Sequence, residues 1–305
     1  MKWEKLGLVY GPDGSLPWAK HTALQPTPIL LSPDVIRVYF GSRDDQGVSR
    51  VGFVDLDARD PSKVLNVAQT PALDIGIAGA FDDNGVVPCA VVAREEGLYL
   101  YYAGYQIPMR AKFMVFGGLA VSRDGGCTFE RYTRVPLLDR TDDEMLFRVA
   151  HSVRLEGGRW RVWYGGGGEW IEDGENTLPV YDVRYMESPD GVVFPRRGTV
   201  HVGFNSADEY RIGRPYVFNE GGLYRMFYGT ARRGIGYRLG YAESPDGVQW
   251  VRRDEAVGLD VSADGWDANM VAYPAVLRSG EQGYMFYNGS DMGRSGFGYA
   301  VLQSW

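Results

Sequence analysis

Four segments of the chain carry an acid five to seven residues before the proline or histidine that opens an apolar stretch. The acids are Asp82 with Asp83, Glu144, Glu209 and Asp267. Glycoside hydrolysis commonly uses two carboxyl groups, because one donates a proton to the leaving oxygen while the other, ionised, activates water or attacks the sugar. Like charges crowded together raise the pKa of one group, which supplies the acid. If the segments converge, we expect Asp82, Asp83, Glu209 and Asp267 to be catalytic.

Other polar and aromatic residues lie close to the same positions and could bind a substrate. An aromatic ring beside hydrogen-bonding groups suits a carbohydrate, because sugar rings have apolar faces and hydroxyl edges. We expect the following residues to bind substrate: His21, Gln25, Arg43, Asp44, Tyr105, Glu144, Arg148, His151, Trp170, Arg211, Arg214, Asn269 and Tyr273. Taken singly, each acid also fits a solvated turn, and most of the aromatic residues also fit packing between sheets.

The segments belong to a repeated series of short strands. An aromatic strand that ends near glycine recurs at residues 36–44, 98–105, 160–168, 223–231 and 283–290. Each follows an apolar strand and a polar turn, which is typical of a β-hairpin, and a third strand comes next. Five repeats of about 45–65 residues predict a propeller.

We therefore predict an all-β fold in which residues 1–305 form a single five-bladed β-propeller domain. The last repeat ends without an outer strand, and the N-terminal stretch "KWEKLGLVY" can supply it. Two packed antiparallel sandwiches would also have regularly spaced turns. The repeated order of the motifs favours the propeller.

A short phrase follows the third strand of three repeats. It reads "SPDG" at 188–191 and 244–247, and "SRDGG" at 122–126. Serine and aspartate side chains accept hydrogen bonds from nearby backbone N–H groups, and glycine tolerates a positive φ, so the phrase predicts a tight turn. It resembles the Asp box of sialidases but lacks the residue between Asp and Gly, which leaves that family as a weaker alternative.

Composition excludes several classes of protein. The net charge of −7 argues against nucleic-acid binding, which needs a basic face. Two cysteines, Cys89 and Cys127, and three scattered histidines predict neither a disulfide scaffold nor a metal site. We expect no cofactor, no membrane partner and a cytoplasmic location, because the sequence has no secretory signal and no long apolar run.

The strands "LYRMFYG" and "WRVWYGG", together with "SPDGVQW" and "SPDGVVF", resemble the five-bladed propeller glycosidase superfamily over essentially the whole chain. That superfamily includes arabinanases, xylosidases, invertase-like enzymes and mannoside phosphorylases. The chain is also similar to propellers associated with bacterial polysaccharide gene clusters, an association that fixes no reaction.

The resemblance implies cleavage or transfer of a glycosidic bond in a central funnel. By position, Asp82 or Asp83 and Glu209 match the family's second Asp and its Glu acid. The arabinanase-like base of the first blade is missing, because His21 and Gln25 stand there. A phosphorylase does without that base, and Arg148, His151, Arg211 and Arg214 would suit bound phosphate. A non-catalytic carbohydrate-binding propeller is the third reading.

Overall fold

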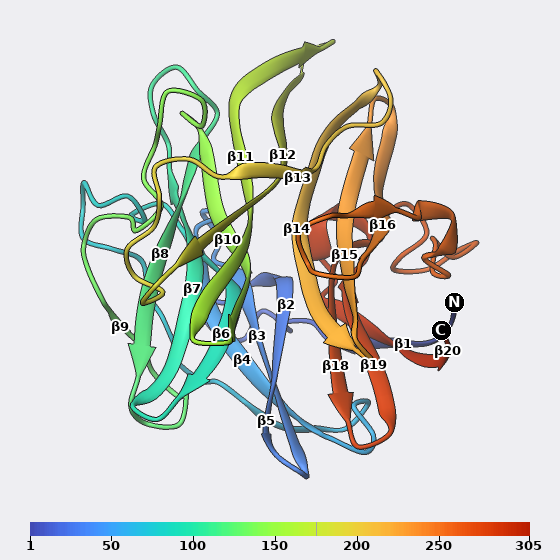
Figure 1. The fold of residues 1–305 in the computed structure, drawn as a ribbon. Helices are drawn as coiled ribbons and strands as arrows, with labels where there is room; N and C mark the ends of the chain where they lie inside the picture. The colour runs from blue at the N-terminus through green and yellow to red at the C-terminus, as the bar shows by residue number, and fades with distance from the viewer. Residues whose placement is uncertain (175) are drawn as a thin grey trace.

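The computed structural model describes residues 1–174 and 176–305, and strands form nearly all of its regular structure. The strands make five successive antiparallel groups of four, called units 1 to 5 here (Figure 1). Unit 1 contains β2 (His21–Ser32), β3 (Val35–Arg43), β4 (Ser49–Asp57) and β5 (Val64–Val67). Unit 2 contains β6 (Val86–Arg94), β7 (Gly97–Gln106), β8 (Met114–Ser122) and β9 (Glu130–Arg131).

The next two units repeat this order. Unit 3 contains β10 (Phe147–Glu156), β11 (Arg159–Asp173), β12 (Asn176–Ser188) and β13 (Thr199–Val202). Unit 4 contains β14 (Glu209–Glu220), β15 (Leu223–Arg232), β16 (Ile235–Ser244) and β17 (Val251–Arg252), and the short 3-10 helix η1 (Asp254–Ala256) follows. Short parallel pairings, β8 with β10 and β12 with β14, join units 2, 3 and 4.

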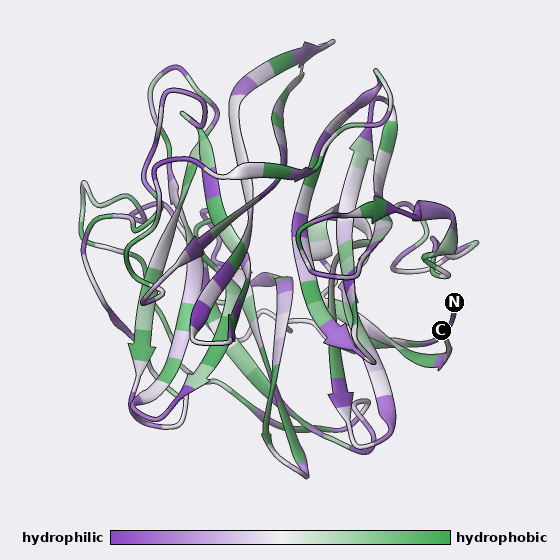
Figure 2. Cartoon of the chain, viewed as in Figure 1, coloured by the Kyte–Doolittle hydropathy of each residue, from purple (hydrophilic) through white to green (hydrophobic). Residues whose placement is uncertain are grey.

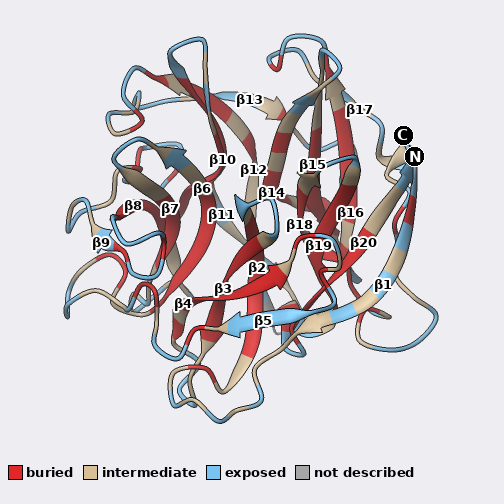
Figure 3. Cartoon of the chain, turned by 90° about the horizontal axis from the view of Figure 1, so that it is seen from below, coloured by how far each residue is buried: buried red, intermediate tan, exposed pale blue. Residues whose placement is uncertain are grey.

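The N-terminal strand completes the last unit, as predicted. Unit 5 contains β18 (Ala272–Ser279), β19 (Gln282–Asn288) and β20 (Phe297–Ser304), with the short helix α1 (Ser290–Gly293) before β20. β1 (Lys2–Tyr10) pairs with β20 in antiparallel fashion, so Lys2 lies opposite Ser304. The two chain ends therefore lie side by side at the edge of the molecule (Figures 1 and 3).

The first strand of each unit is the innermost one, and each contains a β-bulge. The pairing with the second strand shifts at residues 24–27, 88–90, 150–152, 213–216 and 272–275. A bulge places an extra residue on one strand and redirects its side chain. The sequence foreshadows these positions, because a proline stands inside four of the five bulges and cannot donate to the ladder.

The repeated "S-x-D-G" phrase forms a tight turn, as predicted. In the third unit, Asp190 Oδ1 accepts the backbone N–H groups of Val192 and Val193 at 2.9 and 2.8 Å, and Ser188 Oγ accepts that of Gly191 at 2.9 Å. Gly191 has φ +76°, and a Cβ there would lie 2.6 Å from the ring of Trp160.

The same turns also join neighbouring units. Tyr101 of unit 2 donates its hydroxyl to the carbonyl of Gly191 in unit 3 at 2.8 Å. Tyr39 of unit 1 donates likewise to Gly126 in unit 2 at 2.8 Å, and Arg161 of unit 3 donates to Asp246 in unit 4 at 2.9 Å. Each turn is therefore hydrogen-bonded to the preceding unit. This structural role explains why the phrase recurs, without a bound ligand.

The core lies between the units and is rich in aromatic residues. Buried residues fill the inner strands, whereas the outer strand β5 is exposed (Figure 3). Hydrophobic stretches run along the strands and hydrophilic residues gather in the loops (Figure 2). In the described part of the chain, no helix is long and apolar enough to cross a membrane.

Candidate functional site

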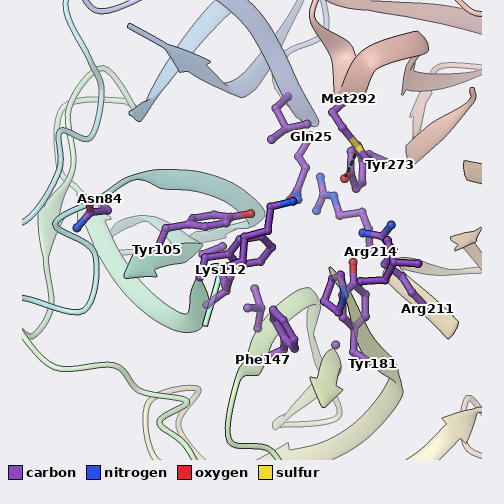
Figure 4. A pocket seen from close by; sticks show the side chains of 18 of the residues that line it. Gln25, Asn84, Tyr105, Lys112, Phe147, Tyr181, Arg211, Arg214, Tyr273 and Met292 are labelled. Atoms are coloured by element: carbon purple, nitrogen blue, oxygen red, sulfur yellow. Dashed lines mark hydrogen bonds between the residues drawn. The ribbon is translucent and has the colours of Figure 1, made fainter. Parts of the chain in front are cut away.

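A cavity of about 580 Å³ lies where the innermost strands converge. This volume is within the range of small-molecule sites. Residues from all five units or from their loops line it (Figure 4). The cavity is therefore built by segments that lie far apart in the chain, as a central funnel requires.

The bulges of four inner strands direct side chains into this cavity. Gln25, His151, Arg214 and Tyr273 lie at or beside the bulge of their strands and line the cavity. Gln25, Arg214 and Tyr273 have φ of +55°, +54° and +55°. Left-handed backbone at a residue other than glycine costs about 1–3 kcal/mol and gathers at functional sites. Three such residues therefore stand at equivalent positions around one cavity.

An aromatic wall closes one side of the cavity. Phe113 and Trp170 meet edge to face with ring centroids 5.0 Å apart, and Phe147 lies 5.5 Å from Trp170 and 5.4 Å from Tyr181. Tyr105 extends the wall and lies 5.8 Å from Phe113. These rings come from units 2 and 3 only, so the wall is confined to one half of the cavity.

Arg211 and Arg214 of unit 4 and Tyr273 of unit 5 line the cavity outside this wall (Figure 4), and His151 of unit 3 lines it as well. Burial, together with the charge of Arg214, holds the pKa of His151 well below its ordinary value, so the imidazole is neutral. Burial also raises the pKa of Tyr273 to about 12, so its hydroxyl stays protonated. Arg211 and Arg214 remain cations, because a guanidinium does not lose its proton in proteins. Hydrogen bonds from these four residues therefore come from neutral and cationic groups.

Eight of the residues expected to bind substrate line this cavity. They are Gln25, Arg43, Tyr105, His151, Trp170, Arg211, Arg214 and Tyr273. The other five, His21, Asp44, Glu144, Arg148 and Asn269, are not among its described lining residues. Asp44 binds Arg50 at 2.8 Å in the turn after β3, and Arg148 binds Glu144 at 2.7 Å inside unit 3.

The four acids expected to be catalytic do not line the cavity. Asp82, Glu209 and Asp267 are 0%, 5% and 2% exposed, but they point into the sheets of their own units. Asp83 lies in the loop before β6, where it accepts the side-chain amide of Asn84 at 2.7 Å and the backbone N–H of Gly79 at 2.8 Å. The expectation that these acids converge on one funnel is therefore wrong.

The buried acids, together with Glu144, form a repeated structural element that we call the acid anchors: Asp82, Glu144, Glu209 and Asp267. Each accepts a hydroxyl from the second strand of its unit and pairs with a base from another strand. Asp82 accepts Tyr102 at 2.9 Å and Arg131 at 2.7 Å. Glu144 accepts Tyr164 at 2.6 Å and pairs with Arg148 at 2.7 Å and Arg184 at 3.2 Å. Glu209 accepts Thr230 at 2.7 Å and Arg252 at 2.8 Å, and Asp267 accepts Tyr287 at 3.0 Å and Lys5 at 2.8 Å.

The anchors explain why the first unit has no acid. The hydroxyls of Tyr102, Tyr164 and Tyr287 each bind an anchor. Unit 1 has Phe40 at the position of these tyrosines, and Ser42, which stands where unit 4 has Thr230, donates its hydroxyl to the carbonyl of His21 at 3.2 Å. The second strand of unit 1 therefore needs no carboxylate acceptor. The sequence suggested that unit 1 had lost a catalytic base. The hydrogen bonding inside the sheet explains instead why unit 1 has no acid at this position.

The anchors predict a loss of stability in acid. Burial opposes ionisation of Glu209 and Asp267, but the bonds from Arg252 and Lys5 lower the pKa of these two carboxyls below their ordinary values. A carboxyl whose folded pKa is depressed contributes stability above its unfolded pKa, about 4, and loses it as the pH falls through the folded pKa. We expect the free energy of unfolding, measured in urea, to begin to fall below about pH 6.5, because unfolded histidines bind protons that the buried His151 and His201 do not, and to fall further below about pH 4 as the anchors are protonated.

The variant Glu209→Gln separates this effect from that of the exposed carboxyls. It should be less stable than the natural protein at neutral pH, and its stability should fall less on acidification, because the titrating anchor is gone. An equal loss of stability in acid for both proteins would contradict the assignment.

The cavity also contains residues that sequence reasoning missed. They are chiefly Lys112, Phe113, Phe147, Tyr181 and Met292. The run of four glycines at 165–168 is a sequence signal that a bulky residue packs closely against this strand. That residue is Tyr181, because a Cβ on Gly167 would lie 2.8 Å from Tyr181 Cβ. No comparable pattern marks Lys112, which lies in the loop between β7 and β8. Across the described residues, no cluster of three or more His, Cys, Asp or Glu side chains could hold a metal ion.

Comparison with known proteins gives two kinds of relative. The chain is 36% identical over 305 residues, the full length of both chains, to "Uncharacterized protein Rv1502" of Mycobacterium tuberculosis (strain ATCC 25618 / H37Rv). It is 35% identical over the same length to "Uncharacterized protein MT1551" of strain CDC 1551 / Oshkosh. No protein-family model matches the chain.

Solved structures share the fold at low sequence identity. A glycoside hydrolase matches with a TM-score of 0.77 and 18% identity over 99% of this chain and 92% of the other. A thermostable family-43 glycoside hydrolase matches at 0.68 and 16% over 93% and 90%. A member of the GH130 family of mannoside phosphorylases, which contains glycoside hydrolases that target β-1,2 mannosidic linkages in Candida mannan, matches at 0.71 and 14% over 98% and 93%. The fold is therefore that of the propeller glycoside hydrolases and phosphorylases.

Proposed function

Since the chain belongs to the family of the mycobacterial proteins Rv1502 and MT1551, with the fold of the propeller glycosidases, we propose that it is a carbohydrate-active protein whose ligand occupies the central cavity. We propose further that residues 1–305 form one domain and that the five units are the blades of a propeller around this cavity. The observation that carries the proposal is the pairing of an aromatic wall with polar residues on strained bulges in one cavity.

The wall suits the apolar face of a sugar ring. Trp170 offers a large surface at little cost in conformational entropy, and Gln25, His151 and the tyrosines can bond hydroxyl edges. The geometry gives less support to hydrolysis by paired carboxylates, because none of the described lining residues is Asp or Glu. Asp83, through Asn84, is the predicted acid nearest to the lining.

A second candidate is a glycoside phosphorylase that binds phosphate through arginine. Arg211 and Arg214 line the cavity without a carboxylate partner, which favours this candidate over a two-carboxylate hydrolase. Of the residues expected to hold phosphate, Arg148 is ruled out as a cavity residue by its pairing with Glu144. Assays of a glycoside panel with and without phosphate distinguish hydrolase, phosphorylase and non-catalytic binding.

The variant Trp170→Ala tests the proposed site. We expect about a two- to tenfold loss of affinity for any sugar that binds, because a stacking contact worth about 0.5–1.5 kcal/mol is removed. The matched control is Trp305→Ala, since Trp305 is 38% exposed at the outer edge, far from the cavity lining. Calorimetric titration of both variants with the sugars that bind the natural protein measures the effect. Equal affinity in the two variants would place the sugar elsewhere.

A further inference from the structure

The cavity has a charge opposite in sign to that of the whole protein. The chain has a net charge of −7. Yet the described residues that line the cavity include four cationic side chains, Arg43, Lys112, Arg211 and Arg214, and no carboxylate. Within residues 1–174 and 176–305, none of the four takes part in an ion pair, whereas other arginines with little exposure, such as Arg37 and Arg252, bind carboxylates at 2.7 and 2.8 Å.

Arg214 is a buried cation whose partners are all neutral. The residue is 2% exposed. Its guanidinium donates to Thr27 Oγ1 at 2.8 Å, to the carbonyl of Pro26 at 3.1 Å and to the carbonyl of Cys89, and its Nε has no partner. A buried charge is unfavourable unless an opposite charge compensates it. The backbone of Arg214 is also strained, with a φ of +54°. An uncompensated charge and a strained backbone therefore occur at the same cavity-lining residue.

Arg211 lies three positions earlier on β14 and faces the same cavity. Its guanidinium lies 4.9 Å from the ring centre of Tyr210 and 4.6 Å from that of Tyr237. It donates to the hydroxyl of Tyr210 at 2.8 Å, and its Nε has no partner. The two Nε atoms are buried, but Arg211 Nη1 donates to no described residue, and guanidinium N–H groups of this kind bind the oxygens of carboxylate and phosphate.

We propose that the carbohydrate ligand carries its own anionic group, a carboxylate or a phosphate attached to the sugar, and that Arg211 and Arg214 bind it with support from Arg43 and Lys112. This inference rests on the proposed function, because it concerns the same cavity. The anionic group is assigned to the sugar because the cavity of about 580 Å³ is far larger than a single oxyanion. The aromatic wall and the arginines line the same space, so one ligand spans both.

Matched pairs of sugars test the inference on the full-length protein. Calorimetric titration would compare each neutral monosaccharide with its uronic acid and its 6-phosphate, and inorganic phosphate alone would be titrated separately. We expect an anionic member to bind about tenfold or more tightly than its neutral parent, as charged hydrogen bonds predict, and the difference to shrink as salt is added.

The variant Arg211→Met should remove most of this preference, measured as the ratio of the affinities for the anionic sugar and its neutral parent. The control Arg59→Met, at a side chain that is 82% exposed and paired with Asp34, should leave the preference unchanged. Arg211 has fewer bonds to the other strands than Arg214, so the test stands even if Arg214→Met does not fold.

The outcomes separate the two proposals. Equal binding of neutral and anionic sugars would overturn the inference and leave the proposed function intact. Inorganic phosphate that binds as tightly as every sugar phosphate, with no gain from a uronic acid, would also overturn it, because the anion would then be a free co-substrate. A panel in which no sugar binds would overturn the proposed function, and the inference with it.

Discussion

The variant Glu144→Gln should lower the free energy of unfolding by about 3–5 kcal/mol, because it removes one partner of a buried ion pair. The Glu144 and Arg148 side chains are only 2% and 5% exposed, and Arg184 shares the same carboxylate. Glutamine keeps the size of the side chain but leaves the buried Arg148 without a counter-charge, whereas Arg184 keeps its pairing with Asp182 at 2.7 Å. Urea unfolding followed by circular dichroism measures the loss.

Asp142→Asn in the same loop is the matched control. Asp142 pairs with Arg196 at 3.2 Å, but the two side chains are 78% and 70% exposed, so the change should alter stability by about 1 kcal/mol or less. Folded Glu144→Gln protein should bind ligand as the natural protein does. If the variant kept its stability but lost its activity, Glu144 would act in the functional site and would not be a structural residue.

The variant Trp3→Ala should destabilise the protein by about 3–5 kcal/mol, the usual loss when a buried tryptophan is truncated. Trp3 lies on β1 and is 7% exposed. Its ring meets Phe227 of unit 4 and Trp305 edge to face, at 5.9 and 6.1 Å between centroids. The side chain therefore ties the closing strand to the core between units 4 and 5.

Leu6→Ala is the control on the same strand. Leu6 is 47% exposed, so its truncation should change stability by about 0.5 kcal/mol or less. Thermal unfolding of both variants measures the difference. If the two substitutions had equal effects, the packing of β1 would contribute little to closure.

The repeat frame was predictable because it rests on local signals. Aromatic strands with period two, glycine-rich turns and the "S-x-D-G" phrase each need only neighbouring residues to fix their conformation. The closure by β1 was also predictable, because the last repeat has no outer strand of its own. Gln25, Arg214 and Tyr273 each stand beside a proline in an innermost strand, and all three line the cavity.

The direction in which the acidic side chains point was not predictable from these local signals. Asp82, Glu209 and Asp267 recur at the expected place in each unit, but their partners lie 49, 43 and 262 residues away in the chain. The spacing in the sequence shows that a carboxylate recurs in each of these units. It does not show whether the carboxylate side chain points toward the cavity or toward the other strands of its unit. Lys112 was missed for a related reason, since a loop residue has no periodicity that assigns it to a cavity.

The pairing of β1 with β20 also determines when the last unit can form during synthesis of the chain. β1 is synthesised before units 1 to 4, and its partner β20 is synthesised after them, so β1 stays unpaired while these units are made. An unpaired strand edge invites aggregation, and charged residues are the usual protection. Lys2, Glu4 and Lys5 supply such charges on β1. The last unit can therefore close only after β20 has been made, and a product truncated before β20 would leave β1 without its partner strand.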